Sequence, residues 1–373
     1  MGHIVWFEQY TSADRCAVGG KNASLGELTC AGLPVPPGFA VTATAYSRAR
    51  DAAGLTEKLA ALVGAADPDR AESVTEAGAA ARGLVASMPL PDHLDAEVRR
   101  AYALLCHRCA ADDVPVAVRS SATCEDQPDA SFAGEHDSYL WVRGADDVLG
   151  YLRRCWASLF TDRAICYRRQ MGYPETGLAM SVVVQKMVQP RAAGVAFTLN
   201  PRDGDRSQVA IDASWGFGEA VVSGEVNPDN FLVDKVIGEV SRRIVSHKEI
   251  EYRLTGADQV ERTPVDQARQ DIPSLTDEEI KAVAALARRA EKYYGCPQDV
   301  EWAVEAVPDG VPGPASGAAV AGACTVLLLQ SRPETVWSRK PPRQAAPTGG
   351  SYMDSIVSSL LAPLHAKRAG DDH

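Results

Sequence analysis

The sequence predicts an α+β or α/β protein in which a cleft separates two lobes. Apolar residues at helical spacing dominate the early part of the chain, above all the Ala-rich and charged residues 51–111. From Met180 the pattern changes to short apolar strands broken by Gly, Asn-Pro and Asp. The length of 373 residues, with 46% hydrophobic residues, suits one large domain of two lobes or two domains.

The first half is expected to combine several helices with a few strands. A short strand opens the chain, and a helix runs from Asn22 to about Ala31, where Gly32 stops it. The elements expected next are two or three helices in 51–111, a buried strand in 114–122, a polar loop up to Gly134, a strand in 138–142 and a helix in 145–172.

The second half is expected to consist mainly of strands. A helix is expected in 275–294, because three acidic residues in its first turn suit the helix dipole. Residues 305–324, rich in Gly, Pro and Ala, predict a flexible loop, and 343–351 predict a linker before a last amphipathic helix. The expected strands are 180–188, 193–199, 208–215, 229–235, 299–304 and 325–332.

The composition excludes several classes of partner. The formal net charge of -11 gives no electrostatic basis for binding nucleic acid or an anionic membrane, although a local basic cleft can still hold a small polyanion. No apolar run approaches the length of a membrane span, and the opening residues lack a secretion signal. The nine cysteines are scattered, so they indicate reduced thiols in the cytoplasm.

Gly19-Gly20-Lys21 is the first candidate phosphate site. Glycine lets the backbone approach a ligand closely, the start of a helix offers free N–H groups, and the lysine adds positive charge. The segment is not a Walker A loop, because Arg15 and Asn22 stand where that motif needs Gly and Ser or Thr. Taken alone, this segment is better explained as a surface lysine beside a structural turn.

A second candidate is the run from Arg119 to Thr123 at the end of an apolar strand. Ligands often bind at the ends of sheet strands, and arginine offers a rigid fork for phosphate oxygens. Ser120, Ser121 and Thr123 add hydroxyl donors, and Gly134 closes the same loop. An ordinary hydrophilic turn is the alternative interpretation.

Four polar residues near the end of the chain predict a metal and phosphate site. Asp299 and Glu301 are two apart on one expected strand, and Gln330 and Arg332 are two apart on another. Residues two apart on a strand share a face, so the four side chains meet if the strands are neighbours. Carboxylate and amide oxygens suit Mg²⁺, and the arginine suits phosphate. A salt bridge across a sheet is the competing interpretation.

Two further segments carry weaker signals. Residues 185–188 follow a run of valines, and such a segment can supply backbone hydrogen-bonding groups and apolar contacts to a flat base. A buried strand that turns to the surface would have the same sequence pattern. Gly216 and Gly218, in residues 215–219, form a lone Gly-x-Gly pattern that indicates little by itself.

Together these segments resemble the ATP-binding domain of phosphoenolpyruvate synthase, pyruvate phosphate dikinase and rifampin phosphotransferase. The resemblance covers about residues 5–337, and its motifs occur in the family's order. They include VGGKNASLGEL, VAVRSSATCEDQPDASFAGEHDSYLWV, DASWGFGEAVVSGEVNPDNFLVDK and DVEWAV…LLLQSRPET. The resemblance implies an α+β fold of the ATP-grasp type, with ATP bound between two lobes.

The resemblance also implies roles for individual residues. In that family ATP is split to AMP and phosphate, and the β-phosphoryl group passes through a histidine on a swivelling domain. The residues implied to be catalytic, by holding phosphates, are Lys21, Arg119 and Arg332. Those implied at Mg²⁺ are Glu301 and Gln330. Those implied at the nucleotide are Lys21, Arg119, Ser120, Ser121, Thr123, Gly134, Asp299, Gln330 and Arg332, with Gln185, Lys186, Met187 and Val188 at the adenine.

The sequence also departs from the family. The family's carrier histidine follows a Gly-rich stretch and a Ser or Thr, but of the seven histidines here only His247 follows Ser, and no Gly precedes it. A domain for the acceptor substrate is not expected within these residues either. The chain is therefore expected to perform half a reaction, passing phosphoryl to a histidine swivel domain on a separate polypeptide. Multi-subunit phenylphosphate synthases resemble such a divided phosphoenolpyruvate synthase.

The expected organisation is one ATP-grasp-type domain over residues 1–338, with lobes of roughly 1–180 and 181–338. Residues 339–373 are expected to form a linker and a tail. The tail either docks a partner or is a disordered or self-packed end.

Three functions compete at this point. The leading one is the ATP-binding subunit of a split dikinase, whose final acceptor is pyruvate, a phenol or another small metabolite. The alternatives are a stand-alone ATP-dependent small-molecule kinase and a nucleotide-sensing protein without turnover. The first predicts AMP once the histidine partner is present, the second predicts ADP without a partner, and the third predicts binding alone.

Overall fold

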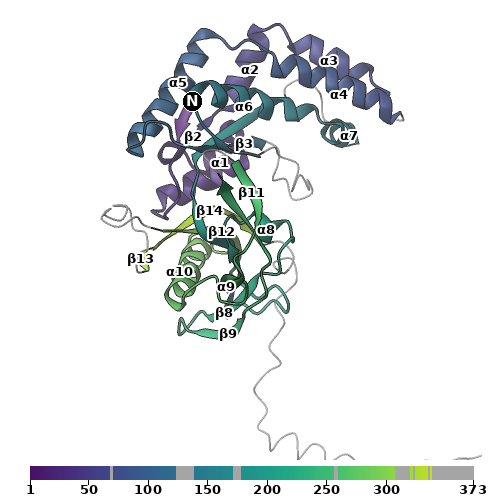
Figure 1. Ribbon diagram of the computed structural model, residues 1–373. Coiled ribbons are helices and arrows are strands. Elements are labelled where there is room, and N and C mark those ends of the chain that lie inside the picture. The colour runs from purple at the N-terminus through teal and green to yellow at the C-terminus, as the bar shows by residue number, and fades with distance from the viewer. Residues whose placement is uncertain are drawn as a thin grey trace, which may run out of the picture. The chain divides into compact units, whose positions relative to one another are not determined.

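The computed structural model describes residues 1–67, 70–122, 138–170, 178–255, 259–306, 320–321, 324–334 and 337. Met1–Glu334 form one compact unit, and a second unit begins at Thr335. Within the first unit, helices dominate the early chain and antiparallel sheet the later chain, which confirms the α+β class (Figure 1). The linker and tail expected in 339–373 lie outside the described residues.

Helices of the first half pack against a five-stranded antiparallel sheet of order β1-β2-β5-β3-β4. Short 3-10 turns lie at Phe7–Gln9, Ser12–Asp14 and Ser158–Phe160. The helices and strands are β1 (Ile4–Trp6), α1 (Arg15–Cys30), β2 (Gly38–Val41), α2 (Ala43–Ala52), α3 (Thr56–Ala65), α4 (Ala71–Ala86), α5 (Asp92–Arg108), β3 (Val116–Ala122), β4 (Ser138–Val142), α6 (Ala145–Ala157), α7 (Asp162–Gln170) and β5 (Met180–Lys186).

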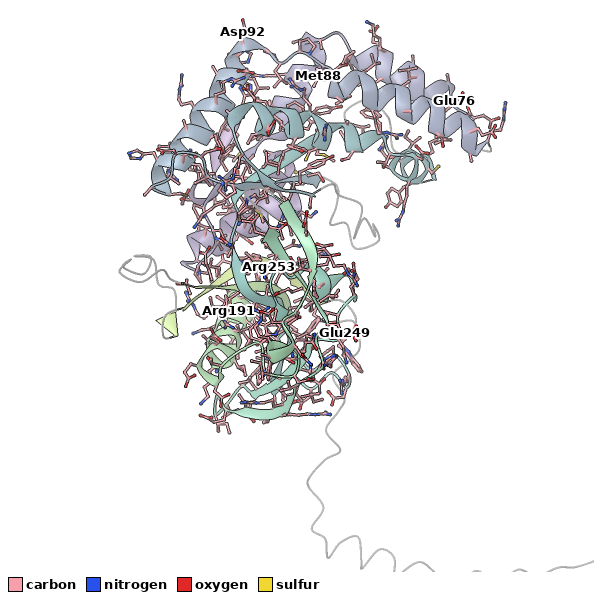
Figure 2. The ribbon with its side chains drawn as sticks, viewed as in Figure 1. Glu76, Met88, Asp92, Arg191, Glu249 and Arg253 are labelled. Carbon is pink, nitrogen blue, oxygen red and sulfur yellow. The ribbon has the colours of Figure 1, made fainter. Side chains whose placement is uncertain are left out.

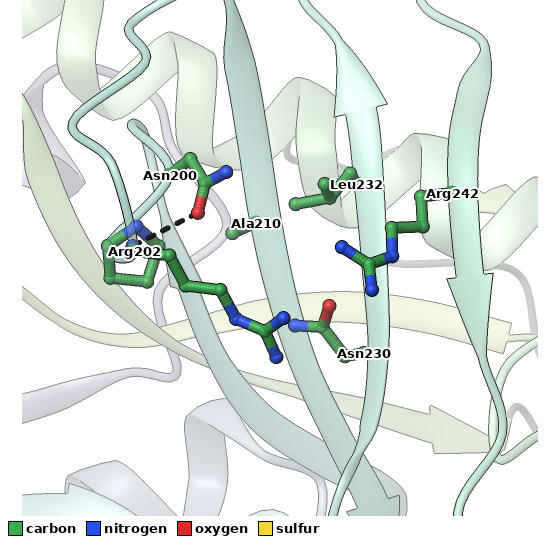
Figure 3. Close-up of a pocket in the computed structure, with 7 residues that line it drawn as sticks. Asn200, Arg202, Ala210, Asn230, Leu232 and Arg242 are labelled. Atoms are coloured by element: carbon green, nitrogen blue, oxygen red, sulfur yellow. Dashed lines mark hydrogen bonds between the residues drawn. The ribbon is translucent and has the colours of Figure 1, made fainter.

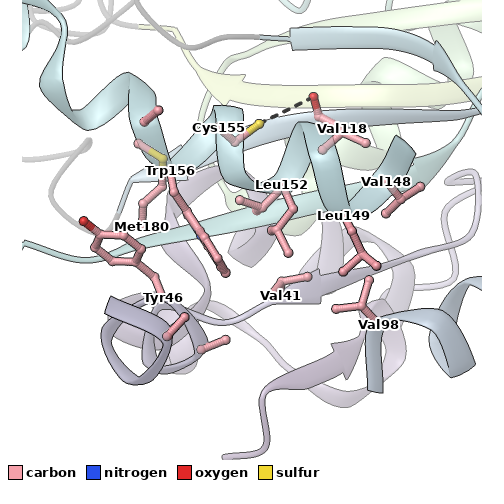
Figure 4. Close-up of a cluster of buried hydrophobic side chains, with 14 of the residues drawn as sticks. Val41, Tyr46, Val98, Val118, Val148, Leu149, Leu152, Cys155, Trp156 and Met180 are labelled. Carbon is pink, nitrogen blue, oxygen red and sulfur yellow. Dashed lines mark hydrogen bonds between the residues drawn. The ribbon is translucent and has the colours of Figure 1, made fainter. Parts of the chain in front are cut away.

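Apolar side chains at helical spacing explain why these helices pack on this sheet. The buried stripe of α6 includes residues three or four apart, from Val148 through Leu152 to Trp156. These side chains meet Val41 and Val118 of the strands in one buried cluster (Figure 4). Burying one large apolar side chain of this kind stabilises the fold by roughly 1.5–3 kcal/mol, so the cluster holds the helices firmly on the sheet.

The single helix expected in 145–172 is divided into α6 and α7, so that expectation was wrong. The backbone leaves helical geometry at Thr161, where ψ is 149°. The Thr161 hydroxyl then accepts a hydrogen bond from the N–H of Ala164 at 3.3 Å, and the Ser158 hydroxyl donates to the carbonyl of Cys155 at 2.7 Å. Such local hydroxyl bonds cap and end helices, and the apolar spacing alone does not reveal them.

The second half is built on a seven-stranded antiparallel sheet of order β13-β14-β12-β6-β7-β8-β9. A separate two-stranded sheet joins β10 and β11. The elements are β6 (Pro190–Phe197), β7 (Gln208–Trp215), α8 (Glu219–Val222), β8 (Asp229–Asp234), β9 (Val240–Ile244), β10 (Ile250–Thr255), β11 (Gln259–Pro264), α9 (Gln267–Gln270), α10 (Asp277–Tyr294), β12 (Gln298–Ala306), β13 (Val320–Ala321) and β14 (Cys324–Pro333).

Helix α10 packs on one face of the seven-stranded sheet. Its start is fixed by a capping box, in which the Thr276 hydroxyl accepts from the N–H of Glu279 and the Glu279 carboxylate accepts from the N–H of Thr276. Arg191 of β6, labelled in Figure 2, donates to both Glu279 oxygens at 2.6 Å. The buried residues of β12, such as Trp302, face α10. Because side chains alternate along a strand, Asp299 and Glu301 point to the opposite face.

The chain passes from one sheet to the other after Lys186. Strand β5 begins at Met180 and pairs with β2 and β3, whereas β6 pairs with β7 and β12. Helix α1 contacts both sheets: the N–H of Asn22 donates to the Ser121 hydroxyl at 3.3 Å on β3, and the Ser24 hydroxyl donates to the Ser331 carbonyl at 3.1 Å on β14. Consequently α1 brings the end of β3 close to the end of β14.

Candidate functional site

The Gly19-Gly20-Lys21 segment lies inside α1, at a kink. The helix begins at Arg15, earlier than expected, and Gly19 interrupts it with a φ of 75°. A Cβ atom at Gly19 would lie 2.3 Å from the carbonyl oxygen of Ser121, so only glycine allows this close approach. The side chain of Asn22 adds a bond to the Ser181 hydroxyl at 3.0 Å. These contacts fix Lys21 next to the end of β3.

Arg119 and Ser121 share one face of β3, while Ser120 points to the other. Val116 and Val118, which alternate with Arg119, belong to the main buried cluster of the first half. Ser120 continues that buried face, and its hydroxyl has no hydrogen-bond partner among the described residues. The structure therefore brings Ser121 towards Lys21 and separates Ser120 from both. Thr123 and Gly134 lie outside the described residues.

The four polar residues expected at one face of the sheet do come together. Strand β12 pairs with β14 so that Asp299 lies opposite Arg332 and Glu301 lies opposite Gln330. The Arg332 guanidinium is 3.8 Å from the Glu301 carboxylate. In the amide orientation that satisfies both partners, the Gln330 oxygen accepts from Nη2 of Arg332 at 2.7 Å. The pairing is as expected from the spacing of the residues along the two strands.

Arg119 faces this group of side chains across the site. Burial lowers the pKa of the Arg119 guanidinium, the carboxylates of Glu301 and Glu219 raise it, and Arg332 lowers it. These three groups belong to β12, α8 and β14, so Arg119 lies within electrostatic range of three elements of the second half. Its Nε is buried and has no hydrogen-bond partner among the described residues. A buried guanidinium N–H of this kind is available to an anionic ligand.

Asp299 supplies a buried carboxylate oxygen to the same site. Its Oδ1 is buried without a hydrogen-bond partner among the described residues. Burial and the nearby Glu334 carboxylate raise the pKa of the Asp299 carboxyl, Arg332 opposes them, and the resulting pKa is about 6. A carboxylate oxygen that the protein leaves unsatisfied fits a metal ion or a ligand donor. Together with Glu301 and Gln330 it forms a set of hard oxygen atoms that suits Mg²⁺.

The side chains of Gln185, Met187 and Val188 lie in three different surroundings. Gln185 is buried in β5, and its amide donates to the Pro36 carbonyl at 3.2 Å. The backbone N–H of Lys186 donates to the Pro37 carbonyl at 2.9 Å. Val188 packs in a small cluster with Ala193 and Ala303. Only Met187 joins the cluster described next.

A small apolar cluster lies beside the charged part of the site. We call Ala117, Trp141, Met187 and Phe217 the site cluster. Ala117 stands two residues before Arg119 on β3, so both side chains lie on the same face. The apolar part of the site is therefore continuous with the charged part along one strand.

Sequence reasoning missed two residues of this site, Glu219 and Trp141. Glu219 begins α8 and interacts electrostatically with Arg119. The preceding Gly216 has a φ of 70°, and a Cβ there would lie 2.1 Å from the carbonyl oxygen of Tyr252. The Gly-x-Gly pattern marks a backbone that is packed too closely for a side chain. It was therefore the sequence signal that could have pointed to the neighbouring Glu219. No pattern pointed to Trp141.

A pocket elsewhere on the seven-stranded sheet is too small to be the nucleotide site. Its lining includes Asn200, Arg202, Asn230 and Arg242 (Figure 3). Its volume of about 10 Å³ holds roughly one water molecule. Within the described ranges, no group of three or more His, Cys, Asp and Glu side chains suits a metal ion. That finding is compatible with Mg²⁺, which commonly binds through one or two carboxylates plus substrate phosphates.

None of the helices in the described residues combines the length and hydropathy that crossing a bilayer requires.

Comparison with known proteins places these residues in context. A family model described as "Pyruvate phosphate dikinase, AMP/ATP-binding domain" matches residues 16–349. The chain is 42% identical over 365 residues to a probable phosphoenolpyruvate synthase of Staphylothermus marinus, covering 92% of this chain and 42% of that protein. It is 40% identical over 353 residues to the phosphoenolpyruvate synthase of Escherichia coli, covering 90% and 42%.

A third relative is named for a different activity. The chain is 42% identical over 303 residues to a rifampicin phosphotransferase of a Streptomyces species, covering 81% of this chain and 34% of that protein. The chain thus spans less than half the length of these three relatives.

Proposed function

We propose that this chain, which belongs to the family of pyruvate phosphate dikinase AMP/ATP-binding domains, binds Mg-ATP between its five-stranded and seven-stranded sheets in the manner of an ATP-grasp fold. The observation that carries the proposal is the position of Arg119. Its guanidinium interacts with groups of β12, α8 and β14, and its buried Nε is left for a ligand. Several positively charged side chains that converge on one place suit a triphosphate as the ligand.

The phosphate groups of ATP would be held by Lys21, Arg119 and Arg332. Lys21 is held next to Ser121 by the kink at Gly19. Arg332 is paired with Glu301 at 3.8 Å, a partial pairing that leaves the guanidinium half exposed. Phosphoryl transfer depends mainly on positioning and on neutralising charge, and these side chains supply both. Removing one preorganised contact of this kind typically lowers the rate on the order of 10²–10³-fold.

Glu301 and Gln330 would hold Mg²⁺, and Asp299 would support the same site. When bound, the metal ion neutralises charge on the phosphate oxygens that it contacts. Before the metal binds, Arg332 occupies the oxygens of Glu301 and Gln330. We therefore expect Arg332 to exchange these contacts for phosphate oxygens when Mg-ATP enters.

We further propose that the chain is the ATP-binding part of a dikinase whose carrier histidine lies on a partner polypeptide. ATP, water and the histidine would yield AMP, inorganic phosphate and phosphohistidine. The final acceptor would be pyruvate, a phenol or another small metabolite. The names of the relatives, two phosphoenolpyruvate synthases and a rifampicin phosphotransferase, support the phosphoryl-transfer part of this proposal.

Product analysis tests this proposal. The purified chain is incubated with Mg-ATP, alone and with the proteins that co-purify with it from native extract, and the nucleotides are separated by chromatography. We expect AMP only in the presence of a co-purified protein that becomes phosphorylated on histidine. ADP formed by the chain alone would contradict the proposal and favour a direct kinase. Tight binding of ATP without turnover in either sample would favour a nucleotide sensor.

A further inference from the structure

Trp141 has a backbone conformation that bulky side chains avoid. Its φ is 60°, in the left-handed region that glycine and asparagine tolerate best. Among the described residues other than glycine, only Ala110 shares a positive φ. Strain of this kind persists only where the surrounding structure enforces it, and it concentrates at ligand sites.

A β-bulge explains how the Trp141 side chain is aimed. In the pairing of β3 with β4, Val116 lies opposite Val142, and Val118 lies opposite Tyr139. Two residues of β4, Leu140 and Trp141, therefore face the single residue Ala117. Bulges of this type turn a strand locally and redirect a side chain, and they are frequent beside binding sites.

The redirected indole lies in the site cluster. Its side chain is largely buried, with 7% of the residue exposed, and it packs edge-on to Phe217 with ring centroids 6.0 Å apart. Ala117 and Met187 complete the cluster. Ala117 and Arg119 are about 7 Å apart along β3, at roughly 3.4 Å per residue. A ribose spans a gap of that order between a base and its phosphates.

We propose that Trp141 is a specificity-determining residue whose indole contacts the base of the bound nucleotide. The inference rests on the proposed function, and it adds a further side chain that contacts the base. An aromatic ring beside a thioether offers a flat and polarisable surface to a purine or pyrimidine. The strained backbone of Trp141 is the structural device that presents this ring beside Arg119.

Calorimetric titration of the whole chain with two ligands tests the inference. ATP carries the base, and inorganic tripolyphosphate carries only the phosphates. We expect Trp141→Asn, which suits the left-handed backbone but removes the ring, to weaken ATP binding by about 5- to 150-fold, the range for loss of one base–aromatic contact. Its affinity for tripolyphosphate should stay within about twofold of the unsubstituted chain.

Two further variants serve as controls for this titration. Trp141→Phe retains an aromatic ring and should lose less ATP affinity than Trp141→Asn, and it serves if the Asn variant does not fold. Ala110→Gly relieves the other positive φ away from the site and should change neither affinity.

The outcomes separate this inference from the proposed function. Unchanged ATP affinity in both Trp141 variants, or equal weakening of ATP and tripolyphosphate, would overturn the role of Trp141 while leaving phosphate binding intact. Failure of the unsubstituted chain to bind either ligand would overturn the proposed function itself.

Discussion

Replacing Asp299 by asparagine removes a buried charge while keeping the shape of the side chain. The pKa of the Asp299 carboxyl rises from 3.8 to about 6 because burial disfavours its charged form and Glu334 lies nearby. The folded protein therefore binds this proton more tightly than the unfolded chain does. The free energy of unfolding falls as the pH rises from about 4 to about 6, and the loss is complete above that window.

The size of the effect follows from the same pKa. A rise from 3.8 to about 6, at about 1.4 kcal/mol per pKa unit, corresponds to about 3 kcal/mol. Partial exposure of the side chain reduces this value, so we expect a cost of about 1–2 kcal/mol at pH 8. Asp299→Asn should therefore unfold at higher urea concentration than the unsubstituted chain at pH 8, and this advantage should shrink towards pH 4.5.

Urea unfolding measured at several pH values, without nucleotide or divalent metal, checks this expectation. Glu301→Gln is the matched control, since Glu301 lies two residues away and has Arg332 as an ion partner; it should be no more stable than the unsubstituted chain at pH 8. An Asp299→Asn variant that is less stable at pH 8, or whose gain is the same at every pH, would refute the reasoning.

Three further substitutions probe the site and its support. Glu301→Ala should abolish Mg²⁺-dependent turnover of ATP in the product assay, because the variant lacks a carboxylate proposed to hold the metal. Gly19→Ala should weaken ATP binding at least tenfold in titration, because a Cβ 2.3 Å from the Ser121 carbonyl forces the Lys21 segment away from β3. Lys248→Met should lower the free energy of unfolding by about 3–5 kcal/mol in urea, because Lys248 and Asp229 form a fully buried pair at 2.7 Å.

Matched controls accompany these three substitutions. Glu278→Ala removes an exposed carboxylate of α10 and should keep full turnover. Full activity of Glu301→Ala would show that the assignment of Glu301 to the metal is wrong. Gly83→Ala adds a Cβ with no neighbour within 4 Å, and an equal effect on ATP binding would contradict the Gly19 argument. Lys281→Met removes an exposed ion pair with Glu239 and should change stability little. A comparable loss in both lysine variants would contradict the role of burial.

The charged part of the site was predictable because its residues follow strand periodicity. Asp299 and Glu301, like Gln330 and Arg332, are two apart, and apolar residues on either side defined both strands. Once β12 and β14 pair in register, the four side chains must share a face. The close approach of the backbone at Gly19 was likewise predictable, because a glycine pair at a helix predicts it.

The remaining parts depend on packing between distant segments. The position of Glu219 follows from the contact of Gly216 with Tyr252, which are far apart in sequence. Trp141 owes its direction to one extra residue in β4, a register shift that alternating apolar residues do not encode. Ser120 was grouped with Arg119 by proximity in sequence, although strand alternation turns its hydroxyl to the opposite, buried face.

Equilibrium binding of Mg-ATP to the chain, with Arg119→Met as the comparison, tests the central claim most directly. Methionine keeps much of the arginine's length and apolar volume but removes the guanidinium that faces Glu301, Glu219 and Arg332. We predict that the chain binds one Mg-ATP and that Arg119→Met weakens this binding at least tenfold while the protein stays folded. Absence of ATP binding, or equal affinity in both proteins, would contradict the account.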